Sequence, residues 1–296
     1  MSDYAALREQ NRRSWNAVVP AHASHRPGLA AFLRDGGLTL FPEERELLGE
    51  VAGLPLLHLM CNSGQDTLSL ARLGAVATGV DLSDAAVGLA RELGAASGLA
   101  ARFVCADVYD YLESARGAGF ARIYCGYGAI CWLHDLGAFA RGVAAALAPG
   151  GRFALVEFHP ASNMFDATWR LAHPYPAGGA RLTLDGVADY VGAAGGGLSP
   201  GGFADGVGDF ANPHPCHLFR WGVGEVASAL AEAGLTLAAL REYPFVNGER
   251  PFERMRPGPG GRWLPPDDVP PIPLMYGLAA ELRAGGPGSP APPLSG

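Results

Sequence analysis

The chain reads LPLLHLMCNSG over residues 54–64, and this stretch decides the fold. The apolar run at residues 54–60 has the length of a buried strand, and residues 61–64 have the composition of a turn. Residues 65–73 then have helical spacing, and a second apolar run follows at residues 75–81. A strand, a helix and another strand in this order predict a β-α-β unit with parallel strands.

The alternation continues along most of the chain. Further strands are predicted at residues 101–106, 121–127, 152–157, 235–243 and 272–282. Helices are predicted at residues 4–18, 43–51, 85–96, 108–116, 136–147 and 223–233. This order predicts an α/β fold, a Rossmann-like, mostly parallel sheet with helices on both faces.

The remaining segments lie outside the alternation. Residues 161–215 are rich in Gly, Pro and aromatic side chains and show weak periodicity, which is typical of an insertion or lid. We therefore divide the chain into an N-terminal helical cap, a cofactor-binding core, a substrate lid, a segment that completes the core and a disordered tail. Their predicted ranges are 1–50, 51–160, 161–218, 219–284 and 285–296, in that order.

Composition excludes several classes of function. The net charge is −7 and all 22 basic residues are arginine, so Schiff-base chemistry and a P-loop lysine are excluded and a nucleic-acid partner is disfavoured. No apolar run reaches the roughly 18 residues of a membrane span, and the N-terminus does not have the pattern of a secretion signal. The five cysteines form no C-x-x-C pair, which predicts reduced thiols, no metal site and a cytoplasmic location.

Three residues mark the predicted strand ends, where open parallel sheets bind ligands. Gly64 follows the first strand, Asp81 ends the second strand 17 residues later, and Asp107 follows the third. Each has a plainer explanation, because a glycine there can be only a turn and an aspartate only a helix cap. Their joint occurrence in this order favours a nucleotide-like cofactor whose ribose binds Asp81. A dinucleotide site would need further glycines, which the sequence around Gly64 lacks, so an NAD(P)-dependent oxidoreductase stays a minor alternative.

Four segments resemble the motifs of class I S-adenosylmethionine-dependent methyltransferases. Residues 56–64 are similar to motif I, 79–83 to the ribose-binding motif, 106–108 to the adenine-binding motif and 147–153 to the loop before the fifth strand. The resemblance covers residues 54–159 and extends to 273–278, which look like that fold's antiparallel last strand. It implies a seven-stranded sheet and S-adenosylmethionine as cofactor, released as S-adenosylhomocysteine. Motif I departs from the usual pattern, because His58 replaces an acid and Met60 and Asn62 replace glycines.

The resemblance also implies site residues. Those expected to bind the cofactor are Trp15, His58, Cys61, Ser63, Gly64, Thr67, Asp81, Leu82, Asp107 and Val108. Those expected to bind the substrate are Tyr4, Tyr127, His134 and His217, and those expected to act in catalysis are His217, His159 and Tyr127. Trp15 can equally be a core residue of an amphipathic helix, and any of the histidines can be structural.

The sequence thus predicts a methyltransferase that acts on an amine or hydroxyl of a small molecule, in bacterial natural-product biosynthesis. A non-catalytic S-adenosylmethionine-binding regulatory protein is the alternative from another class. No nucleic-acid or membrane partner is expected, and a homo-oligomer stays open. The arginines of residues 249–262 can bind a substrate carboxylate or pair with Glu249 and Glu253.

Overall fold

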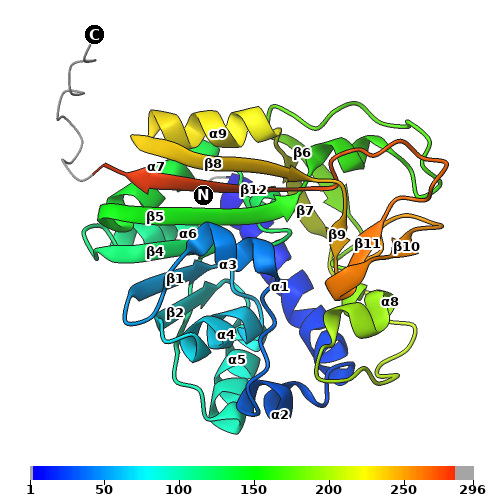
Figure 1. The fold of residues 1–296 in the computed structure, drawn as a ribbon, viewed down its shortest axis with the longest axis horizontal. Coiled ribbons are helices and arrows are strands. Elements are labelled where there is room, and N and C mark those ends of the chain that lie inside the picture. Colours follow the sequence, from blue (N-terminus) through cyan, green and yellow to red (C-terminus); the bar gives the residue numbers. More distant parts are fainter. Residues whose placement is uncertain (1–2, 284–296) are drawn as a thin grey trace.

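A seven-stranded sheet forms the centre of the computed structural model, which describes residues 3–283 (Figure 1). Its strand order is β3-β2-β1-β4-β5-β12-β8. In chain order the strands are β1 (Pro55–Leu59), β2 (Val76–Asp81), β3 (Arg102–Cys105), β4 (Phe120–Cys125), β5 (Leu147–Phe158), β8 (Leu235–Tyr243) and β12 (Met275–Leu282). The predicted alternation is confirmed, since all seven predicted strands belong to this one sheet.

Strand direction also follows the prediction. The β1–β2, β1–β4, β2–β3 and β4–β5 pairs are parallel. The last strand, β12, runs antiparallel to both of its neighbours, β5 and β8. The sheet is therefore a mostly parallel, Rossmann-like sheet whose last strand is antiparallel.

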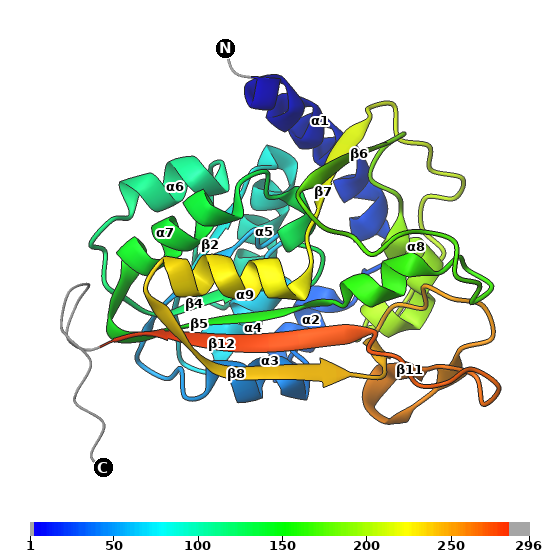
Figure 2. The same ribbon diagram turned by 90° about the horizontal axis from the view of Figure 1, so that it is seen from above.

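Helices cover both faces of the sheet (Figure 2). They are α1 (Asp3–Ser24), α2 (Leu29–Arg34), α3 (Pro42–Leu48), α4 (Gln65–Arg72), α5 (Asp84–Ser97), α6 (Val108–Ser114), α7 (Leu136–Ala146), α8 (Tyr190–Ala194) and α9 (Val223–Glu232). Side chains of α6, α7 and α9 form one apolar cluster with the sheet, while α3 and α4 pack on the opposite face. Successive strand residues point to opposite faces, so Leu57 joins the first cluster and Leu56 the second. Within the described residues, no helix combines the length and apolar character needed to cross a membrane.

Two parts of the chain hold more regular structure than the sequence predicted. The predicted lid contains β6 (Ala180–Leu184), which pairs with β7 (Cys216–Arg220), so the predicted boundary after residue 218 falls inside a strand. The predicted loop at 249–262 contributes to a small sheet of β9 (Val246–Asn247), β10 (Arg256–Pro257) and β11 (Arg262–Leu264). The short helix α2 was not predicted either. These strands have only two to five residues, which is too short for a clear periodic signal.

Three arginines of residues 249–262 form ion pairs with acids other than the predicted Glu249 and Glu253. Arg254 pairs with Asp268 at 2.8 Å, Arg256 with Asp267 at 2.9 Å, and Arg262 with Glu43. The added elements gather beyond the carboxyl end of β5, at the right of Figure 1. The predicted tail at 285–296 lies outside the described residues.

Candidate cofactor and acceptor site

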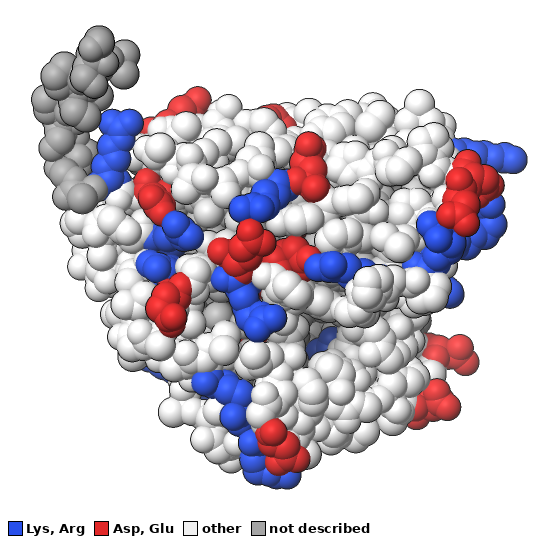
Figure 3. All heavy atoms as spheres, viewed as in Figure 1, with Lys and Arg blue, Asp and Glu red and all other residues white. Residues whose placement is uncertain are grey.

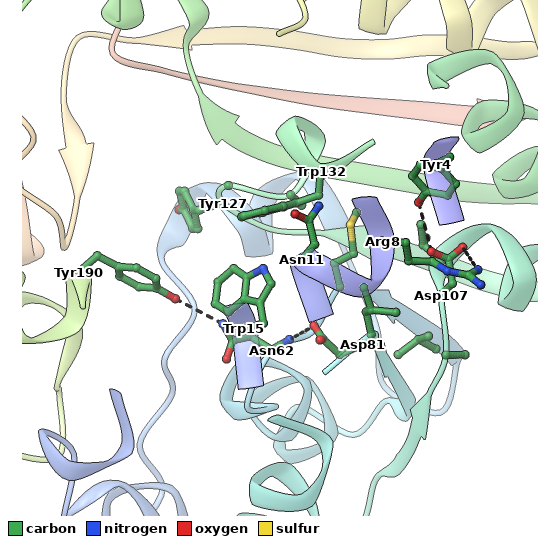
Figure 4. A pocket seen from close by; sticks show the side chains of 17 residues that line it. Tyr4, Arg8, Asn11, Trp15, Asn62, Asp81, Asp107, Tyr127, Trp132 and Tyr190 are labelled. Carbon is green, nitrogen blue, oxygen red and sulfur yellow. Dashed lines mark hydrogen bonds and ion pairs between the residues drawn. The ribbon is translucent and has the colours of Figure 1, made fainter. Parts of the chain in front are cut away.

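A cavity opens at the carboxyl ends of β1, β2 and β3 and beside the loop that follows β4 (Figure 4). It encloses about 790 Å³ of empty space, which includes its open mouth. Seven of the predicted site residues line it: Tyr4, Trp15, Asp81, Leu82, Asp107, Val108 and Tyr127. The cavity therefore occupies the place where the topology predicts a ligand.

Asp81 presents a fixed carboxylate to this cavity. Its Oδ2 accepts a hydrogen bond from the Asn62 backbone N–H at 2.7 Å, and its Oδ1 accepts one from the Ser83 N–H at 2.9 Å. Burial raises the pKa of Asp81, while these N–H donors oppose that shift. A carboxylate oriented in this way still has lone pairs for hydroxyl donors such as those of a ribose.

Asp107 serves two elements at once. Its Oδ1 accepts from the Tyr109 backbone N–H at 2.9 Å and so caps α6, which is the plainer of its two predicted explanations. Its Oδ2 accepts from the Tyr4 hydroxyl at 3.2 Å, and the Arg8 guanidinium lies 3.8 Å from the carboxylate. Asp107 therefore fastens α1 to the strand end as well as lining the cavity.

The helix α1 supplies one wall of the cavity. Tyr4, Arg8, Asn11 and Trp15 all line it, and their spacing places them on one side of the helix. The centroid of the Trp15 ring lies 5.5 Å from that of Trp132 and 6.5 Å from that of Tyr190, at interplanar angles of 64° and 77°. Trp15 is thus a cavity residue as well as a packing residue.

Several lining residues are not among the site residues that the family resemblance implied. They include Arg8, Asn11, Asn62, Gly128, Ala129, Trp132 and Tyr190. The helical spacing of residues 4, 8, 11 and 15 could have identified the first two. Nothing local marks Tyr190, because its hydroxyl accepts from Asn62 Nδ2 at 3.3 Å across 128 residues of sequence.

The motif I side chains lie behind the cavity wall. His58 is buried, its Nδ1 lies 2.8 Å from the Thr67 hydroxyl, and burial lowers its pKa to about 3. Cys61, Ser63, Gly64 and Thr67 do not line the cavity either. These five were expected to contact the cofactor. Two of their side chains hold the β1–α4 turn in shape: the Thr67 hydroxyl contacts His58, and the Ser63 hydroxyl donates to Gln65 Oε1 at 2.8 Å. A cofactor contact by these residues stays a prediction.

The backbone geometry at position 64 explains why the turn needs a glycine there. The φ of Gly64 is 75°, and a Cβ there would lie 2.6 Å from the Phe103 ring and 2.7 Å from the Ala90 Cβ. Close packing of the turn against α5 and β3 therefore requires a glycine here. Met60 and Asn62, which stand where the family motif has glycines, also have positive φ values of 54° and 49°. The turn thus keeps its left-handed shape despite the substitutions, at a cost of roughly 1–2 kcal/mol for each such residue.

The expected catalytic histidines do not line the cavity. His217 is buried against Gln10, and its Nδ1 lies 3.0 Å from the Thr183 hydroxyl. His159 caps the short 3₁₀ helix at Pro160–Met164 and lies 2.9 Å from Glu242. The pairing of β7 with β6 turns His217 toward α1. His134, an expected substrate residue, stacks on Tyr4 beside a separate shallow hollow.

Tyr127 follows β4 and connects the cavity to a buried polar cluster. Its hydroxyl accepts from Asn247 Nδ2 at 2.9 Å and donates to Glu44 Oε2 at 3.3 Å. The loop that carries it is held by Glu157, which accepts from the backbone N–H groups of Gly128, Ala129 and Ile130 at 2.6 to 3.0 Å. Within residues 3–283 no group of three or more His, Cys, Asp or Glu side chains is placed to hold a metal ion.

Comparisons with known proteins give one matching domain and several similar folds. Residues 56–151 match a family model described as a methyltransferase domain, whereas no curated protein sequence matches the chain significantly. An S-adenosylmethionine-dependent methyltransferase from Mesorhizobium loti shares the fold at 20% identity, over 84% of this chain and 99% of that one, with a TM-score of 0.52. A second S-adenosylmethionine-dependent methyltransferase, from Methanosarcina mazei, shares the fold at 16% identity, over 82% of this chain and 98% of that one, with a TM-score of 0.52. The CcbJ methyltransferase from Streptomyces caelestis is similar at 16% identity, 93% and 99% coverage and a TM-score of 0.51.

The matched domain contains the strand ends that form the cavity, and the shared folds extend over most of the chain. Residues 56–151 thus match a methyltransferase domain, and most of the chain has the fold of solved S-adenosylmethionine-dependent methyltransferases.

Proposed function

We propose that the protein transfers a methyl group from S-adenosylmethionine to an amine or hydroxyl of a small organic molecule. One observation carries this proposal: the cavity combines the fixed carboxylate of Asp81 at a strand end with an aromatic wall of Trp15, Trp132 and Tyr190. The first feature suits a nucleoside cofactor, and the second suits a small acceptor.

The lining residues divide the cavity into two parts. Asp81 and Leu82 would hold the ribose, and Asp107 and Val108 would flank the adenine. S-adenosylmethionine, when bound, supplies a methyl group that is already activated on a sulfonium. The protein then has to position the acceptor and exclude water, which is the task we assign to the aromatic wall and Tyr127.

Surface charge agrees with a small acceptor. Acidic and basic side chains are interspersed on the face seen in Figure 3, and the net charge is −7. Such a surface offers no broad positive field to a phosphate backbone. We keep bacterial natural-product biosynthesis as the proposed setting, on the resemblance of the sequence motifs.

Most aromatic residues of the predicted lid do not contribute to the acceptor wall. Phe165 and Trp169 pack in the cluster that contains Phe252, and Phe203 stacks on His25. Of the aromatic residues in the predicted lid, Tyr190 lines the cavity. Most aromatic residues of the lid therefore stand outside the proposed acceptor site.

Two measurements test the proposal. Calorimetry is expected to show binding of S-adenosylhomocysteine and none of NAD(H), and the reverse result would contradict the cofactor assignment. A panel of small amines and alcohols with isotope-labelled S-adenosylmethionine is expected to yield a labelled product. Cofactor binding without transfer to any member of the panel would favour a non-catalytic, regulatory protein.

A further inference from the structure

A buried carboxylate lies directly behind the cavity, at Glu44 on α3. Its side chain accepts hydrogen bonds from the Phe41 backbone N–H at 2.6 Å, from the Tyr127 hydroxyl at 3.3 Å and from the Tyr124 hydroxyl. Glu44 is only 1% exposed, and within residues 3–283 no arginine or histidine forms an ion pair with it. A buried carboxylate without a cation is costly and needs a reason.

Neighbouring charges do not neutralise Glu44. Its neighbour in sequence, Glu43, pairs with Arg262 and accepts from Asn247 Nδ2 at 3.2 Å. The group facing Glu44 from α4 is a second acid, Asp66. Burial, with a smaller contribution from Asp66, raises the pKa of Glu44 to about 8. Glu44 can therefore exchange a proton near neutral pH.

Tyr127 joins this carboxylate to the cavity. Tyr124 is fully buried and does not line the cavity, whereas Tyr127 does. Asn247 donates to the Tyr127 oxygen, so the hydroxyl proton of Tyr127 is directed to Glu44 and an oxygen lone pair stays available. The hydrogen bonds thus run from Asn247 through Tyr127 to Glu44, with the proton acceptor at the buried end.

We propose that Glu44, acting through the hydroxyl of Tyr127, accepts the proton that the acceptor loses during methyl transfer. This inference rests on the proposed function. The acceptor proton moves to the Tyr127 oxygen while the Tyr127 proton moves to Glu44 Oε2. The bond from acceptor to methyl carbon forms as the bond from that carbon to sulfur breaks, with its electron pair left on sulfur. After product release, the proton returns through Tyr127 to water in the cavity.

In this scheme Tyr127 touches the acceptor, and Glu44 is a positioning residue that sets where the proton goes. The test compares the pH dependence of kcat in four proteins: wild type, E44Q, Y127F and Y124F. Y124F is the matched control, because it removes a hydroxyl from the same carboxylate on the side away from the cavity. Acceptors come from the amine and alcohol panel, and S-adenosylhomocysteine calorimetry and thermal melting accompany each variant.

For wild type we expect kcat to rise with pH up to about 8 and then level off, because only the deprotonated Glu44 can accept a proton. E44Q and Y127F are expected to lower kcat by about 100-fold and to lose this pH dependence, with unchanged affinity for S-adenosylhomocysteine. Y124F is expected to keep the rise in kcat, at a shifted midpoint. A folded E44Q or Y127F variant with the wild-type pH profile would overturn the proposal.

Other outcomes are distinct. If E44Q does not fold, Y127F and the solvent deuterium isotope effect on wild-type kcat decide, and a Y127F variant that keeps both the profile and the isotope effect would overturn the relay. If wild type binds no S-adenosylhomocysteine, or transfers no methyl group to any acceptor, the proposed function itself fails and the relay falls with it.

Discussion

The strand ends of β1, β2 and β3 and the cover formed by α1 with residues 180–220 border the same cavity, yet different contacts hold them. At the strand ends the partners are close in sequence: Asp81 binds the N–H groups of Asn62 and Ser83. In the cover the partners are distant. Asn11 exchanges two hydrogen bonds with the backbone of His217, at 3.0 and 2.7 Å and 206 residues away.

This difference has a thermodynamic consequence. The strand-end turn is part of the apolar core, so it can lose its shape only when the sheet unfolds. The cover is fastened by a small apolar cluster around Val18, Val187 and Cys216 and by polar contacts such as the bond from the Val187 N–H to the Ser14 hydroxyl at 2.9 Å. Net contributions of such bonds are about 0.5–1.5 kcal/mol each, so the cover can open locally while the sheet stays folded.

The largest expected effect is at the strand end. Replacing Asp81 with alanine removes the carboxylate assigned to the ribose, and we expect affinity for S-adenosylhomocysteine to fall by roughly 1.5–3 kcal/mol, about 10-fold to 100-fold or more. Calorimetry measures this change. Glu92→Ala, at an exposed acid on α5, is the control and should bind as wild type does. An unchanged dissociation constant for Asp81→Ala would place the ribose contact elsewhere.

The cover is tested by Asn11→Ala. Loss of both hydrogen bonds to His217 should cost about 1–3 kcal/mol, and this cost should appear as faster hydrogen exchange of residues 180–220. Amides of β1 and β2 should keep their protection. If the sheet and the cover lose protection together, the two regions form one cooperative unit and the cover does not open locally.

Acidification should lower the free energy of unfolding, because each region contains a buried neutral histidine. Burial lowers the pKa of His58 behind the strand ends to about 3 and that of His22 in the cover to about 4. The unfolded chain takes up these protons near pH 6.5, so the free energy of unfolding falls below pH 6.5 by up to about 1.4 kcal/mol per pH unit for each histidine.

His25 acts in the opposite direction, since the Ala204 carbonyl and then Asp189 raise its pKa. Urea unfolding of wild type and H58Q at pH 7 and pH 5 isolates the contribution of His58. The difference in stability between the two proteins should shrink on acidification, because H58Q lacks the proton uptake. An equal difference at both pH values would show that His58 is protonated in the folded protein.

The smallest effect concerns the junction of the two regions. Ser83 caps α5 by accepting from the Ala86 N–H at 3.0 Å and donates to Asn16 of α1 at 2.6 Å. Ser83→Ala should lower the free energy of unfolding by about 1 kcal/mol in a urea titration. Ser114→Ala, at an exposed serine of α6, should leave it within about 0.5 kcal/mol of wild type. A silent Ser83→Ala variant would mean that water replaces the cap.

The candidate site could be predicted from the sequence only where its residues follow a strand or share a helix face. Asp81 ends β2 and Leu82 follows it, while Asp107 and Val108 lie two and three residues after the end of β3, and the topology alone brings them to one edge. The positions of the histidines could not be predicted in this way, because the direction of a loop side chain depends on the element against which the loop packs. His217 points toward α1 since β7 pairs with β6, a pairing that no local pattern predicts.

What the sequence determined by itself was the order of strands and helices, the left-handed turn around Gly64 and the acids at the strand ends. These features depend on local periodicity and backbone sterics, which are properties of neighbouring residues. Only the tertiary structure decided that Glu44, Asn247 and Tyr127 meet, and that Tyr190 reaches Asn62. Those contacts join residues 83 to 128 positions apart, and their formation depends on how whole elements pack against the sheet.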